Sequence, residues 1–237
     1  MKKRTGRYLI AAAQIDTEQV YEPAAALEAL KAASNAKFDE TIDIALQLGV
    51  DPRHGDQMVR GIATLPFGTG RKRRVAAFAK GDKAVDAAEA GADVVGAEDL
   101  IAKIQGGWRE FDVLVATPDM MPLLGKSLGR VLGPKMPSPK SGTVTADIGK
   151  AIADIKQGAQ VEYRVDKAGI VHAPIGKVSF PIENLVGNLT ALLVTVQRAK
   201  PASAKGHYMR QIILSSTMGP GVKLDMAAAK AMAERKK

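Results

Sequence analysis

The sequence lacks cysteine altogether, and it has few aromatic residues and only three histidines. The absence of cysteine excludes disulfides, thiol catalysis and Cys-ligated zinc. His54, His172 and His207 form no close pair and no HExxH motif, so we expect no metal site and no cofactor. No apolar run approaches the roughly 18 residues needed to cross a membrane, and we expect no membrane partner.

Phosphate-binding motifs are also missing. The apolar segment RRVAAFA is followed by KGDKAV, which has one glycine where the dinucleotide fingerprint needs GxGxxG. The segment FGTGRKRR precedes that strand and lacks the spacing of a P-loop. No pair of acidic residues is set apart by its spacing as a general acid and base. The sequence therefore predicts a protein that is not an enzyme. The rival interpretation is an enzyme that binds a nucleotide or a phosphorylated metabolite, and a nucleotide-dependent thermal shift would favour it.

Positive charge is what the chain has in excess. Its 237 residues include 34 Lys and Arg against 25 Asp and Glu, which gives a net charge of +9 and a pI near 9.7. Such a charge favours a polyanionic partner. The basic N-terminus soon loses its apolar character and carries Asp16 and Glu18, which is typical neither of a signal peptide nor of a transit peptide. We therefore expect a cytoplasmic protein.

Alternation of apolar and polar residues predicts strands near both ends of the chain. In KFDETIDIALQL the apolar residues fall on even positions, which places Phe38 in phase with the core-facing Ile42 and Ile44. VEYRVDKAGIVHAPI predicts a hairpin that turns at residues 166–169, and HYMRQIILSS predicts a further strand. Helices are expected at PAAALEALKAA and along the apolar stripe from Leu185 to Val196.

The middle of the chain has a different pattern. RRVAAFA, DVV and FDVLVA are short apolar runs, as expected of strands buried on both faces, and helical segments separate them. This order predicts βαβ units around a parallel sheet, followed by a helix with Ile148, Ile152 and Ile155 on one face. The basic cluster at residues 71–74 would either contact phosphates or form a solvated edge.

We predict two domains, one α+β and one α/β. Residues 1–67 and 160–237 would form a discontinuous α+β domain with an antiparallel-type sheet, and residues 68–159 an inserted Rossmann-like domain with a parallel sheet. Gly68, Gly70 and Gly158 lie at the two crossings and would act as hinges. The inserted part has 14 basic and 11 acidic residues, hence +3, and the remainder has 20 and 14, hence +6. The discontinuous domain is therefore the better candidate for binding a polyanion.

Four segments of the chain are informative together: KFDETIDIALQLGVDPRHGDQMVRGIATLPFGTGRKRRVAAFA, GADVVGAEDL, FDVLVATPDMMPLLGKSLGRVLGPKMPSPKSGTV and SSTMGPGVKLD. In this order they resemble the ribosomal protein L1 family of the bacterial large subunit. The resemblance implies a two-domain protein that binds the stalk of 23S rRNA beside the site from which deacylated tRNA leaves. It also implies other ribosomal components as partners, a monomer off the ribosome, and repression of its own operon through a mimic of the ribosomal site in the messenger.

Carried over by motif, the resemblance places an RNA-binding surface on the discontinuous domain. The residues implied are Lys37, Phe38 and Thr41 of KFDET, Arg164, Asp166, Lys167 and Gly169 of VEYRVDKAG, and Ser215, Thr217, Met218 and Gly219 of SSTMGPG. The lysines and the arginine would contact phosphates, the two hydroxyls would reach 2′-hydroxyls or backbone, and glycine would permit close approach. For Phe38 the phase favours the core and the resemblance favours RNA, so both roles stay open.

Two other functions are alternatives to specific RNA binding. A nucleic-acid chaperone without specificity would bind DNA and RNA alike. A peripheral membrane protein would need a basic amphipathic helix, and none is evident in the sequence. Aromatic residues make up only 4% of the chain, so RNA would be gripped by phosphates, 2′-hydroxyls and shape rather than by stacked bases.

Overall fold

The computed structural model describes residues 5–71 and 73–234. The chain divides into two compact units: Met1–Gly70 together with Val161–Lys237, called here the first unit, and Arg71–Gln160, the inserted unit. The division falls three residues after the expected first crossing and one residue after the expected second crossing.

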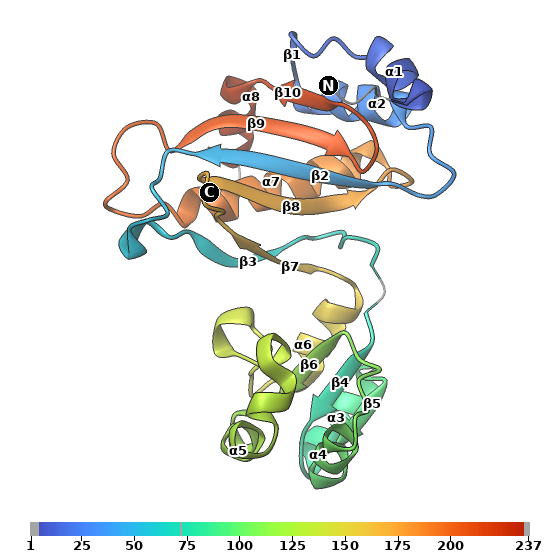
Figure 1. The fold of residues 1–237 in the computed structure, drawn as a ribbon, viewed down its shortest axis with the longest axis vertical. Coiled ribbons are helices and arrows are strands. Elements are labelled where there is room, and N and C mark those ends of the chain that lie inside the picture. The colour runs from blue at the N-terminus through green and yellow to red at the C-terminus, as the bar shows by residue number, and fades with distance from the viewer. Residues whose placement is uncertain (1–4, 72, 235–237) are drawn as a thin grey trace. The chain divides into compact units, whose positions relative to one another are not determined.

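The first unit is built on a five-stranded sheet of order β1-β10-β9-β2-β8 (Figure 1). The central strands are antiparallel, as the sequence predicts, but the edge pair β1–β10 is parallel. No hairpin links these two strands, so a turn does not dictate their direction. The bounds are β1 Val20–Tyr21, β2 Thr41–Leu48, β8 Ile170–Lys177, β9 Met209–Ser216 and β10 Gly221–Leu224.

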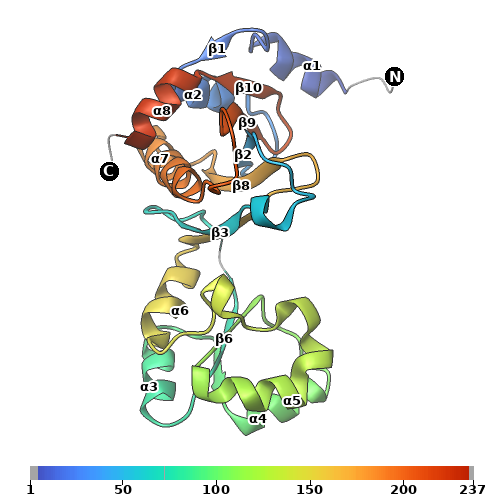
Figure 2. The same cartoon turned by 90° about the vertical axis from the view of Figure 1, so that its left-hand side faces the viewer.

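Helices pack against the strands of this sheet (Figure 2), and about every second side chain is buried along β2, β8, β9 and β10. On β2 the even positions from Ile42 to Leu48 are buried and the odd positions are half-buried, which confirms the predicted alternation from residue 42 onward. Helix α7 buries the predicted stripe from Leu185 to Val196. The bounds are α1 Gly6–Ala13, α2 Pro23–Ala33, α7 Ile182–Arg198 and α8 Met226–Glu234.

The segment predicted as a hairpin is used differently. The strands and the turn are where the sequence places them, but β7 (Gln160–Arg164) pairs with β3 (Arg60–Thr64) in a separate two-stranded sheet. A single bridge, Val165 to Val171, joins the two arms of the expected hairpin. The alternation in β7 indicates one buried face and does not say which strand covers its edge. A short 3-10 helix, η1 (Gly55–Gln57), precedes β3.

The inserted unit contains the predicted parallel sheet, of order β5-β4-β6. Helices α3 and α6 form one core with its residues, and α4 and α5 form another. The bounds are β4 Val75–Phe78, α3 Asp82–Glu89, β5 Val94–Gly96, α4 Glu98–Gln105, β6 Val113–Ala116, η2 Pro118–Met120, α5 Met121–Leu132, η3 Gly133–Lys135, η4 Pro139–Ser141 and α6 Ile148–Lys156. The apolar runs of this part thus correctly predict a Rossmann-like arrangement.

Candidate nucleic-acid interface

The residues implied by the resemblance fall into two groups at opposite ends of β2. Thr41 at the start of the strand lies across from Lys177, whereas Gln47 near its end lies across from Ile170. At about 3.3 Å per residue, the two ends are about 20 Å apart. We call them the KFDET end, residues 37–41 with 215–219, and the DKAG end, residues 164–169.

At the KFDET end, Thr217 is bonded to the main chain of Thr41. Its hydroxyl accepts a hydrogen bond from the Thr41 N–H at 3.0 Å and donates to the Thr41 carbonyl at 3.2 Å. The Thr217 N–H donates to the same carbonyl at 3.0 Å. Because the single hydroxyl proton is used within the protein, the Thr217 hydroxyl can accept a further hydrogen bond but cannot donate one.

Beneath this contact lies Glu40, which sequence reasoning missed and which is 2% exposed. Its carboxylate accepts hydrogen bonds from the Ser34 hydroxyl at 2.8 Å, the Ala36 N–H at 3.3 Å and the Met218 N–H at 2.9 Å. Burial by itself would raise the pKa of Glu40, but these bonds and one from the Ser216 hydroxyl outweigh it and lower the pKa. The resulting stabilisation is present at neutral pH and is lost as the pH falls through the lowered pKa.

Phe38 is 55% exposed, so the prediction from its phase that it belongs to the core is wrong. The strand begins at Thr41, and its alternation continues back to the buried Glu40 but not to Phe38. Lys37 is exposed as well, and Met218 is 46% exposed. The KFDET end therefore presents a cation and two large apolar side chains to solvent.

Helix α1 adds side chains that the sequence analysis did not select. The N-terminal segment and the turn after β9 together line a shallow pocket, whose residues are Thr5, Arg7, Tyr8, Thr217, Met218 and Gly219. Arg7 brings a further cation to this end. The basic character of the N-terminus was the available signal, and it did not reveal which residue would meet the turn.

Gly219 is explained by packing within the turn. A Cβ placed on Gly219 would collide with the hydroxyl of Ser216, a residue that is 4% exposed. Glycine at this position thus makes room for Ser216, whose hydroxyl bonds to Glu40. Ser215 lies across from Asp43 of β2 and is half-buried.

At the DKAG end, Asp166 shapes the turn. One oxygen of its carboxylate accepts hydrogen bonds from the N–H groups of Ile170 and Ala168, each at 2.8 Å. The bond from Ile170 is the largest cause that holds the pKa of Asp166 below its usual value. The other oxygen lies 3.8 Å from His172 Nε2. Asp166 therefore orders the exposed turn that carries Lys167, and Arg164 is exposed on the strand before it.

Gly169 has a structural reason to be glycine. Its φ is +81°, its N–H donates to the carbonyl of Asp166, and its own carbonyl accepts from Leu48 N–H at 2.9 Å. A Cβ would lie 3.2 Å from the carbonyl oxygen of Val50 and 3.3 Å from that of Leu48. Glycine at position 169 thus permits a close approach to the main chain at the end of β2 and just beyond it.

We expect Gly169→Ala to destabilise the first unit more than Gly206→Ala, as measured by urea unfolding. Gly206 has a φ of +76° and open space around a Cβ, so its substitution isolates the cost of the left-handed backbone, about 1–2 kcal/mol. The additional loss at Gly169 would come from its contacts with main-chain oxygens. Equal losses would contradict this interpretation.

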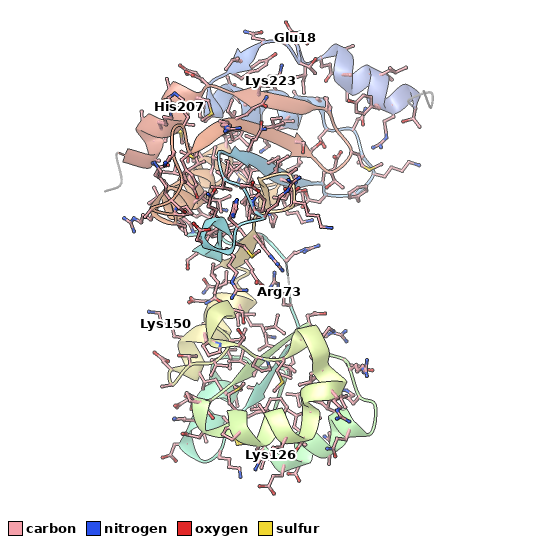
Figure 3. The ribbon with its side chains drawn as sticks, turned by 60° about the vertical axis from the view of Figure 1, so that its left-hand side comes forward. Glu18, Arg73, Lys126, Lys150, His207 and Lys223 are labelled. Carbon is pink, nitrogen blue, oxygen red and sulfur yellow. The ribbon has the colours of Figure 1, made fainter. Side chains whose placement is uncertain are left out.

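A partly exposed sheet face connects the two ends. The odd positions of β2 and their cross-strand neighbours share it, because residues directly opposite in a sheet point the same way. We call it the open face, and its polar members include Gln47, His172, Gln211, Ser215 and Lys223. Figure 3 labels Lys223 among the side chains of this unit. None of the cross-strand neighbours could be assigned from the sequence, because the register was unknown.

The inserted unit also carries cations at its surface. Arg71 and Arg73 line a shallow pocket with Asp112 and Val113, and Arg74 Nε lies 3.9 Å from Asp112. Lys72, part of the same predicted basic cluster, lies outside the described residues. Lys126 and Lys150, labelled in Figure 3, are exposed.

The three glycines predicted as hinges all have positive φ: Gly68 at +62°, Gly70 at +71° and Gly158 at +66°. Asn188 of α7 donates to the Gly68 carbonyl at 2.8 Å, and a Cβ on Gly70 would lie 3.1 Å from the Phe180 ring. Both glycines are thus packed within the first unit. Bending at any of the three stays a prediction.

Within residues 5–71 and 73–234, no group of three or more His, Asp or Glu side chains is placed to hold a metal ion. In the same residues, no helix is both long enough and apolar enough to cross a membrane. The described side chains instead place cations, hydroxyls and exposed apolar groups around one sheet. Exposed cations and hydroxyls are the groups that contact phosphates and sugars in nucleic-acid complexes.

The Rossmann-like insertion and the exposed cations around this sheet agree with the class of polyanion-binding proteins that the net charge predicts. Residues 30–220 match the model of the Ribosomal protein L1p/L10e family, so the chain belongs to this family, as its motifs predict. It is a ribosomal protein that binds large-subunit rRNA, and it is not an enzyme. The family match thereby overturns the rival interpretation of a nucleotide-dependent enzyme.

Proposed function

We propose that the first unit binds the stalk of 23S rRNA across the KFDET end, the open face and the DKAG end. The observation that carries this proposal is the position of Lys37 and Lys167, which are exposed at opposite ends of one sheet. Phosphate contacts at both ends would fix the orientation of a folded RNA, and hydroxyls near Thr217 would meet its 2′-hydroxyls.

Two finer roles follow from the family resemblance. The protein would form the mobile stalk that takes part in the release of deacylated tRNA from the E site. It would also repress its own operon by binding a mimic of the rRNA site in the messenger. The free protein would be a monomer. Ribosomes that lack it would release deacylated tRNA at an altered rate, and adding the protein back would restore the original rate.

Competition between RNAs tests whether one surface serves both rRNA and messenger. We expect unlabelled operon leader RNA to displace a labelled 23S stalk fragment completely from the full-length protein. An unrelated RNA hairpin of equal length should need at least about a thousandfold higher concentration, the usual lower bound of specific over non-specific binding. A ratio near one would instead identify a chaperone without specificity.

A further inference from the structure

The Glu40 carboxylate joins two segments that are 176 or more residues apart in the chain. From one side it accepts the Ser34 hydroxyl and the Ala36 N–H, and from the other the Met218 N–H, a partner 178 residues away. The Ser216 hydroxyl is the fourth donor. Every ion pair recorded among the described residues involves other carboxylates, so neutral donors hold this buried charge.

These two segments carry the exposed groups of the KFDET end. Lys37 and Phe38 lie between the Ser34–Ala36 donors and Glu40 itself, and Met218 is held by its own N–H. The bonds between Thr41 and Thr217 continue the same junction at the surface. One buried group therefore fixes the backbone from which all these side chains project.

Joining the two segments would not by itself require a buried carboxylate. The sheet is already joined at this point by the β2–β9 pairing, which includes Ile42 with Ser216. Burying a charge costs desolvation free energy, which is offset only where the geometry is good and the hydrogen bonds of the charge are complete. What the carboxylate adds to the pairing is a fixed conformation of the two irregular segments beyond the strand ends.

We propose that Glu40 is a positioning residue for RNA binding, which presets residues 34–38 and 216–219 in the conformation that RNA requires. The inference rests on the proposed function, because it takes the KFDET end to be an RNA contact. Preset loops lose less conformational entropy on binding, so the free energy of the RNA contacts is available as affinity. Glu40 touches no RNA itself and acts through Lys37, Phe38 and Met218.

Glu40→Gln is the sharpest test in the full-length protein. Its amide has one oxygen, so one of the two main-chain N–H groups, of Ala36 or of Met218, must face an NH2 donor instead of an acceptor. We expect the affinity for the 23S stalk fragment to fall tenfold to a hundredfold. Amide hydrogen exchange at residues 34–38 and 216–219 should rise in the free variant and return to the parent level when RNA is bound.

The matched control is Val196→Ala, a cavity at the far end of α7 that lowers stability without touching either segment. It should bind RNA like the parent at a temperature where both variants are folded. If Val196→Ala weakens binding as much as Glu40→Gln at equal loss of stability, Glu40 acts only through the stability of the fold and the proposal is overturned. If Glu40→Gln does not fold, Ser34→Ala removes a single donor and is expected to lower affinity severalfold; unchanged affinity would overturn the proposal.

Lys37→Ala and Met218→Ala separate the inference from the proposed function. If both weaken binding while Glu40→Gln binds like the parent, the surface is correct and the positioning role is wrong. If neither changes binding, the KFDET end is not an RNA contact, and both the proposed surface and the role of Glu40 fall together.

Discussion

Excess stalk RNA is expected to stabilise the first unit against unfolding and to leave the inserted unit unchanged. At a free RNA concentration of about 100 times Kd, the free energy of unfolding of the first unit should rise by about 2.7 kcal/mol. The reason is that the proposed contact residues lie within residues 37–41, 164–169 and 215–219, which all belong to the first unit. Hydrogen exchange of peptides from each unit, measured against urea concentration, reports the two free energies separately.

Two core variants, one in each unit, test whether RNA stabilises only the first unit. Leu128 is fully buried in a core of the inserted unit and Ile44 in the core of the first unit, so each alanine substitution should cost about 2–5 kcal/mol in its own unit. RNA should restore stability to Ile44→Ala and none to Leu128→Ala, whose affinity should match the parent. Protection of both units to the same degree would contradict the assignment of RNA binding to the first unit alone.

Elements with a complete apolar repeat could be predicted from the sequence. The stripe of α7 and the run from Ile42 to Leu48 bury the expected side chains because each pattern matches the period of its element. The same argument failed for Phe38, because alternation is informative only within the strand, and the strand begins at Thr41. Helices α1 and α8 were not expected, since their short apolar patterns do not stand out from the basic termini.

The partners of polar side chains could not be predicted in the same way. Glu40 bonds to a residue 178 positions away, and the hydroxyl of Thr217 to the main chain of Thr41, 176 positions away. Such bonds depend on the register of β2 with β9, which hydrophobic pattern alone does not specify. A charged residue in phase with the buried side of a strand, as Glu40 is with Ile42, was the one local signal of a buried carboxylate.

A large loss of affinity is expected when cations are removed from both ends of the sheet. Lys37→Ala and Lys167→Ala should each lower the slope of log K against log salt by about 0.7–0.9, because each lysine would neutralise one phosphate. If the parent and the variants have the same affinity near 1 M salt, the affinity of each single variant at 0.1 M salt is then about fivefold to eightfold lower than that of the parent. The double variant should lose about 25-fold to 60-fold, since distant and independent contacts add.

Two control variants show what the slopes mean. Lys126→Ala removes the same charge from an exposed position on the inserted unit and should leave the slope unchanged. Thr217→Val removes the hydroxyl that accepts the Thr41 N–H but no charge. It should weaken binding by the same factor at every salt concentration.

The double variant also decides whether one RNA spans the open face. If a single RNA contacts both ends, the decrease in slope for the double variant equals the sum of the two single decreases, between about 1.4 and 1.8. A decrease confined to Lys37→Ala or to Lys167→Ala would restrict the contact to that end and contradict the proposed path. A comparable decrease for Lys126→Ala would show that net charge, rather than the position of these lysines, governs the affinity. Additivity at both ends with Lys126→Ala unchanged is therefore the expected result, because only a ligand about as long as β2 can reach Lys37 and Lys167 together.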